Sequence, residues 1–101
     1  MLEPVAFEDL RNFIRRRIVR ARYRVGSTYY PTTLNDIAVL PSGTVRAQLS
    51  IIPNTGATIN RVELFSNDGK LWAYQNVNIT VATGQTGILY WFDFNITEKE
   101  V

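Results

Sequence analysis

The chain has 101 residues, a net charge of +2 and hydrophobic side chains at 46% of its positions, which is typical of one folded domain over residues 1–101. It contains neither cysteine nor histidine, so the sequence excludes disulfides, zinc sites with nitrogen and sulfur ligands, and Ser-His-Asp or Cys-His catalysis. We therefore expect a non-enzymatic protein with no metal and no cofactor.

An amphipathic helix is predicted over residues 6–17. Its apolar side chains recur at helical spacing, at Phe7, Leu10, Phe13, Ile14 and Ile18. Glu8 and Asp9 are expected in its first turn and residues 15–17, all arginine, in its last turn. These charges oppose the helix macrodipole and so favour the helix.

Seven short strands are predicted after the helix, within a β region of about residues 18–97. Residues alternate between two strand faces at 18–25, 45–51, 61–64, 76–81 and 88–97. Two further strands are expected, at 34–40 before the turn at 41–43 and at 70–74 as the antiparallel return of a hairpin. Residues 67–69, Asn-Asp-Gly, predict a hairpin with a type I′ turn. The expected fold is mostly β (α+β), with one N-terminal helix followed by an antiparallel β-sandwich or open barrel.

The first predicted strand has an apolar face and a basic face. Val19, Ala21, Tyr23 and Val25 alternate with three arginines, at Arg20, Arg22 and Arg24. Residues 1–25 carry a net charge of +4 and residues 26–101 a net charge of −2. The arginine row allows three interpretations: contacts with nucleic-acid phosphates, a solvated face paired across the sheet with acids such as Glu63 or Asp93, or a contact with another protein.

Aromatic side chains form a second candidate site. Trp91 shares its predicted strand face with Asp93, Asn95 and Thr97, so it is expected to be partly exposed. Exposed tryptophans anchor many protein interfaces, and exposed Trp and Tyr also stack on sugars. Trp72, Tyr74 and Trp91 therefore predict a protein interface, with core packing or a glycan site as the alternatives.

The start of the chain does not read as a secretory signal, because Glu3 and Pro4 come early and no basic segment precedes an apolar one. The longest apolar runs are far shorter than the ~20 residues that cross a bilayer. We expect a soluble protein that is not secreted by a signal peptide and does not enter a membrane.

Residues 57–98 carry a pattern of apolar strands around one turn: I-x-x-V-x-L-F, a D-G turn, LWAYQNVNI, a polar loop and a final aromatic strand. The matching positions are Ile59, Val62, Leu64, Phe65, Asp68, Gly69, Leu71, Trp72 and 88–96. This pattern resembles small tail and baseplate proteins of bacteriophages and prophages, and the attachment domains of tail fibres.

The resemblance implies a stand-alone structural subunit of a phage tail, baseplate or fibre. Such a subunit would be made in the cytoplasm of a bacterial host and end in the virion tail. It would assemble as a trimer or hexamer and bind other tail proteins. Rings of this kind use head-to-tail contacts between two different patches, which segregated charge would suit. The residues expected to make these contacts are Arg20, Arg22, Arg24, Trp72 and Trp91.

Overall fold

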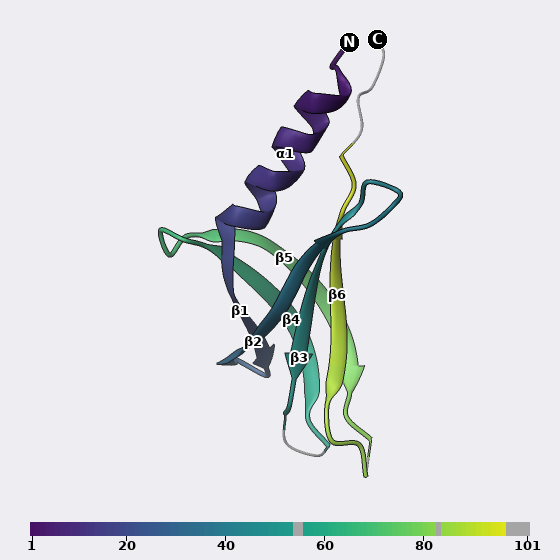
Figure 1. The fold of residues 1–101 in the computed structure, drawn as a ribbon. Helices are drawn as coiled ribbons and strands as arrows, with labels where there is room; N and C mark the ends of the chain where they lie inside the picture. Colours follow the sequence, from purple (N-terminus) through teal and green to yellow (C-terminus); the bar gives the residue numbers. More distant parts are fainter. Residues whose placement is uncertain (54–55, 83, 97–101) are drawn as a thin grey trace.

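The computed structural model describes residues 1–53, 56–82 and 84–96, and these form one helix and six strands (Figure 1). In chain order the elements are α1 (Pro4–Arg17), β1 (Ile18–Val25), β2 (Thr28–Val39), β3 (Val45–Ile51), β4 (Thr58–Ser66), β5 (Leu71–Thr80) and β6 (Ile88–Phe94). The expected mostly-β fold with one N-terminal helix is confirmed. The predicted strand 88–97 ends at Phe94, and residue 97 lies outside the described residues.

The strand number is six and not seven because β5 is continuous. The predicted break at residue 75 does not occur: Gln75 stays in register opposite Val62 and accepts a hydrogen bond from the hydroxyl of Tyr90. Strand β2 is also longer than predicted, since it begins at Thr28 and not at residue 34. In β5, the polar residue Gln75 was mistaken for an end of the strand.

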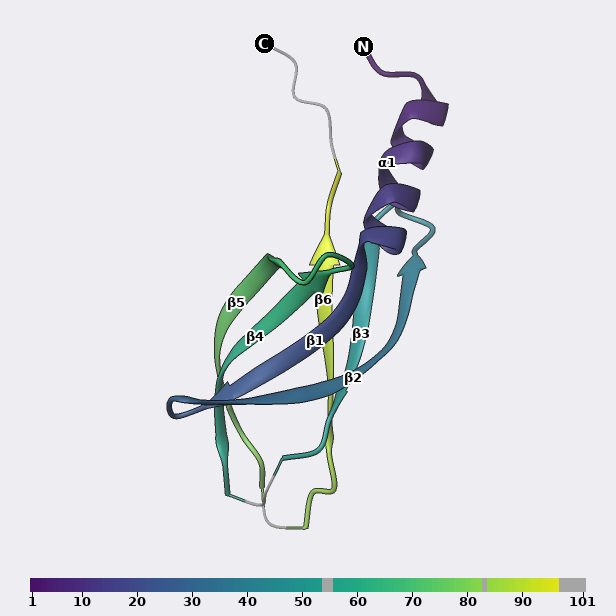
Figure 2. The ribbon, with the colours of Figure 1, turned by 90° about the vertical axis from the view of Figure 1, so that its left-hand side faces the viewer.

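All strands are antiparallel to their neighbours in a single curled sheet with the order β5-β4-β1-β2-β3-β6 (Figure 2). Strand β2 holds the two halves of the sheet together. Its first part pairs with β1 up to Thr32, and from Thr33 onward it pairs with β3. The sheet thereby forms an open half-barrel, with β5 and β6 as its two edges.

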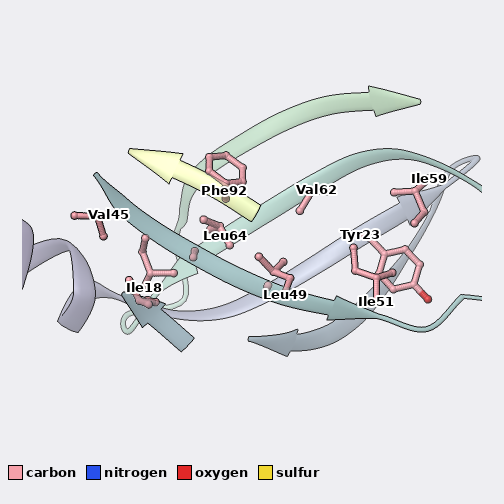
Figure 3. Close-up of a cluster of buried hydrophobic side chains, with 12 residues drawn as sticks. Ile18, Tyr23, Val45, Leu49, Ile51, Ile59, Val62, Leu64 and Phe92 are labelled. Atoms are coloured by element: carbon pink, nitrogen blue, oxygen red, sulfur yellow. The ribbon is translucent and has the colours of Figure 1, made fainter. Parts of the chain in front are cut away.

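The core fills the inner face of this half-barrel (Figure 3). The buried hydrophobic side chains come from all strands but β5, plus one loop residue, and they are Ile18, Ala21, Tyr23, Ile37, Val45, Ala47, Leu49, Ile51, Ile59, Val62, Leu64, Val81 and Phe92. Strand β3 alternates strictly between buried and partly exposed residues, as the sequence predicted. Full burial of such a side chain stabilises the fold by roughly 1.5–3 kcal/mol.

The inner face of β1 differs from the prediction at its first residues. Val19 is 46% exposed, whereas Ile18 is 2% exposed. The register with β4 shifts between Ile18 and Arg20, so one extra residue enters β1 and reverses the facing of the residues before it. Ala21 and Tyr23 point into the core as predicted, and Val19 does not.

The turn after β4 also differs from the prediction. The amide of Gly69 donates to the carbonyl of Ser66 at 3.0 Å, and Gly69 has a φ of +80°. A type I′ turn needs positive φ at both central residues, but Asn67 and Asp68 have none. The loop is therefore a turn of three residues in which the glycine alone adopts the left-handed conformation.

Helix α1 begins two residues earlier than predicted, with Pro4 in its first turn and Glu3 as N-cap. Proline suits this position because its missing N–H would have no helical partner there. Glu8 and Asp9 consequently lie outside the first turn, which holds no acid.

Helix α1 projects from one end of the sheet (Figures 1 and 2). Its Ile14 packs against the core, Arg11 Nε donates to the carbonyl of Gly43 at 2.8 Å, and Arg15 Nε donates to the carbonyl of Ile37 at 3.0 Å. No residue of α1 is buried.

Candidate protein-interaction surfaces

The three arginines of β1 lie on the outer face of the sheet, and Arg22 stands at the centre of a row of contacts. Its Nε donates to Glu63 on β4. Its guanidinium lies 3.9 Å from the ring centroid of Tyr29 on β2 and 4.7 Å from that of Phe65 on β4. Arginine between two aromatic faces gains attraction from both ring quadrupoles. Arg22 is therefore held in one position.

Glu63 is the most buried charged residue of this outer face, at 2% exposed. Besides Arg22 it accepts a hydrogen bond from Arg61 Nε at 2.8 Å. Arg61 in turn lies 3.9 Å above the ring of Tyr74 on β5. The structure shows Arg22 paired across the sheet with Glu63. This is one of the three interpretations that the sequence allowed for the arginine row.

Arg24 and Arg20 differ in their surroundings. Arg24 Nε donates to Asn60 Oδ1 at 2.7 Å, and its Nη1 donates to the Tyr29 hydroxyl at 3.5 Å. Arg20 has no hydrogen bond or ion pair within residues 1–53, 56–82 and 84–96; it lies at a shallow groove that Pro31 and Phe65 also line. The predicted arginine row exists, but of its three members only Arg20 keeps a guanidinium without a partner in the described part of the chain.

Trp91 lies on the outer face of edge strand β6 and is 54% exposed, as its strand face predicted. The guanidinium of Arg46, on the neighbouring strand β3, covers one face of the indole at 4.1 Å from a ring centroid. Arg46 also donates two hydrogen bonds to Asp93, at 2.8 and 3.0 Å. These hydrogen bonds lower the pKa of the Asp93 carboxyl below its usual value. Leu89, 70% exposed, extends the same face.

Trp72 lies on the opposite edge strand, β5, and turns toward the other edge of the half-barrel. Its ring meets that of Phe94 edge to face, with centroids 5.6 Å apart. The structure thus separates the five predicted contact residues: the arginines share the outer face of β1, Trp91 stands on the outer face of β6, and Trp72 closes the gap between β5 and β6.

Sequence reasoning missed one residue of the Trp91 surface, Arg46. Leu89 alternates outward on the same strand face as Trp91, as predicted. Arg46 also alternates outward in its strand, but its proximity to Trp91 could not be predicted, because the pairing of β3 with β6 joins segments far apart in the chain.

The described residues contain no group of three or more His, Cys, Asp or Glu side chains that could hold a metal ion. Asp68 serves the turn before β5: the Ser66 hydroxyl donates to it and Arg17 pairs with it at 2.9 Å, so its pKa is lowered. Within the described residues no helix has the length and apolar character to cross a membrane.

No protein-family model, curated protein or solved structure matches this chain.

Proposed function

We propose that this protein is a non-enzymatic structural subunit of a tailed phage or prophage, which assembles through protein–protein contacts in the tail, baseplate or fibre. The observation that carries the proposal is the surface formed by Leu89, Trp91, Arg46 and Asp93. The assignment to a phage tail rests on the resemblance of residues 57–98 described above.

The Trp91 surface has the properties of an interface anchor. Binding energy concentrates in tryptophan, tyrosine and arginine side chains that are already held in their bound position. Arg46 stacks on Trp91 and is itself fixed by two hydrogen bonds to Asp93. The indole therefore loses little conformational freedom when a partner covers it, and Leu89 adds apolar area beside it.

The contacts favour a protein partner over the two other ligands that the sequence allows. Trp91 and Tyr74 each already carry an arginine on one ring face, and Trp72 packs against Phe94, so the three residues do not form one free aromatic platform for a sugar. Within the arginine row of β1, Arg22 and Arg24 already have partners, so only Arg20 of that row offers a guanidinium without one in the described residues. Nucleic-acid binding through Arg20 alone predicts a salt slope of only about −0.9.

The first test is the absolute mass in solution, measured by light scattering after size exclusion at two protein concentrations and at low and high salt. We expect a trimer or hexamer of the wild type, and Trp91→Ala with Leu89→Ala to weaken it. Leu71→Ala, which truncates another exposed apolar residue, is the matched control. A wild-type monomer under every condition that also binds no tail protein contradicts the proposal.

A further inference from the structure

Helix α1 carries an apolar stripe that stays largely exposed among the described residues of its own domain. Ala6, Leu10 and Phe13 follow one another at intervals of four and three residues, which places them on one side of the helix. Leu10 is 43% and Phe13 50% exposed. The side toward the sheet is a different one, where Ile14 and Arg15 make contact.

Two opposite charges flank this stripe on the same edge. Asp9 and Arg16 are seven residues apart and line the same shallow groove as Leu10 and Phe13. Neither makes an ion pair or hydrogen bond with any described side chain, and both are exposed. The opposite edge of the stripe is apolar, with Phe7 and Ile14.

The positions of these charges distinguish the two ways in which copies of α1 can pack. In a parallel pair, one edge of the stripe meets the opposite edge of its neighbour, so Asp9 and Arg16 would face apolar Phe7 and Ile14. In an antiparallel pair, like edges meet. With Leu10 against the second copy's Phe13, each Asp9 lies beside an Arg16, and opposite charges adjoin at both ends.

We infer that α1 packs antiparallel against α1 of a second copy about a two-fold axis, through Leu10 and Phe13 and two Asp9–Arg16 ion pairs. The inference deepens the proposed assembly function and rests on it. Two helices of 14 residues, each about 21 Å long, form a contact at the small end of specific interfaces, below about 1,200 Å². A hexamer made of three such pairs contains the two-fold axis, whereas a ring of three copies does not.

Cross-linking of introduced cysteines tests the orientation directly, because the chain has no cysteine of its own. In the antiparallel pair, Leu10→Cys and Phe13→Cys proteins mixed together form a mixed disulfide. Ala6→Cys protein alone forms none, since its two cysteines lie about 16 Å apart along the axis at ~1.5 Å per residue, beyond the ~7 Å that a disulfide spans between Cα atoms. A parallel pair gives the reverse result and overturns the inference.

Charge reversal tests the ion pairs. Asp9→Arg and Arg16→Asp each replace two attractions by two repulsions, so each variant alone dimerises more weakly than the wild type. A mixture of the two variants, and the double variant Asp9→Arg/Arg16→Asp, regain dimerisation. Glu8→Arg reverses a charge on the far side of the helix and is the matched control, expected to leave dimerisation unchanged.

The outcomes separate this inference from the proposed function. If Leu10→Ser and Phe13→Ser leave the wild-type oligomer intact while Trp91→Ala weakens it, assembly stands and the helix pairing is overturned. If the serine variants reduce a wild-type hexamer to particles of half its mass and keep the circular dichroism of the sheet, the helix pairing is supported. A wild type that stays monomeric at every concentration overturns the pairing.

Discussion

Trp72 and Phe94 meet edge to face, 5.6 Å between ring centroids, although their strands β5 and β6 are the two opposite ends of the sheet order. The Tyr90 hydroxyl donates to Gln75 across the same gap. Side chains thus bring the two edges together where the strand order has no backbone pairing. Burial raises the pKa of Tyr90, as expected for a phenol lining this gap.

The contact between Trp72 and Phe94 should be measurable as a coupling energy. We expect a double-mutant cycle of Trp72→Ala and Phe94→Ala to give about 0.5–1.5 kcal/mol in urea unfolding, the range for aromatic pairs in contact. The control cycle combines Trp72→Ala with Trp91→Ala, whose indole stands on the outer face of β6 and does not touch Trp72. A coupling of the same size in both cycles would refute a specific contact across the gap.

Glu63 and Arg22 should contribute to stability, whereas Arg20 should not. Arg22→Ala removes a charged donor from a carboxylate that is 2% exposed. We expect it to lower the free energy of unfolding by about 1.5–3 kcal/mol, because hydrogen bonds to charged groups contribute that much. Arg20→Ala is the matched control on the same strand face and should stay within about 0.5 kcal/mol of the wild type. If chemical denaturation showed the same loss of unfolding free energy for Arg22→Ala and Arg20→Ala, the contacts described for Arg22 would not stabilise the fold.

The position of Trp91 should depend on pH through Asp93. The lowered pKa means that folding favours the ionised carboxylate, so the stabilisation is complete above the unfolded value of about 3.9 and is lost as pH falls through the folded pKa. In a Trp72→Phe background, Trp91 fluorescence should change over that acid range as Arg46 is released. The Asp93→Asn variant should show at neutral pH the Trp91 fluorescence that the wild type shows in acid. If its fluorescence at neutral pH is that of the wild type, Asp93 does not hold Arg46 against Trp91.

Two arginines should hold α1 on the sheet. Arg11→Ala with Arg15→Ala removes both side-chain donors to the carbonyls of Gly43 and Ile37. A helix of 14 residues is marginal in water without tertiary contacts. Hydrogen exchange of the helix amides should therefore become faster in dilute protein, while β3 and β4 stay protected. Arg16 has no hydrogen bond or ion pair within the described residues, so the control variant Arg16→Ala should leave the exchange of the helix amides unchanged.

The order and faces of most elements could be predicted from the sequence, because burial on one face imposes the alternation that the pattern reveals. Strands β3 and β6 follow it residue by residue. Val19 could not be placed, because the register shift in β1 depends on which strand lies beside it. The continuity of β5 through Gln75 was missed for a related reason, since Tyr90 reaches this side chain only after the sheet curls.

The candidate site was predictable in its residue types but not in its contacts. The outward direction of Arg22 follows from alternation alone, and Glu63 was one of the acids considered as its partner. The burial of Glu63 was not readable, because Arg22 and Arg61 cover it and come from different strands. The bond between Arg46 and Asp93 depends on the same kind of long-range pairing.

The double pairing of β2 determines how the chain can reach its native state. Its hairpins with β1 and β3, like the hairpin of β4 and β5, join consecutive strands and cost little loop entropy. The pairings of Ala21 with Leu64 and of Ala47 with Phe92 join residues more than 40 positions apart and form only after long loops close. We therefore expect the three-strand unit around β2 to form early, and the docking of the β4–β5 hairpin and of β6 on its opposite sides to limit the refolding rate.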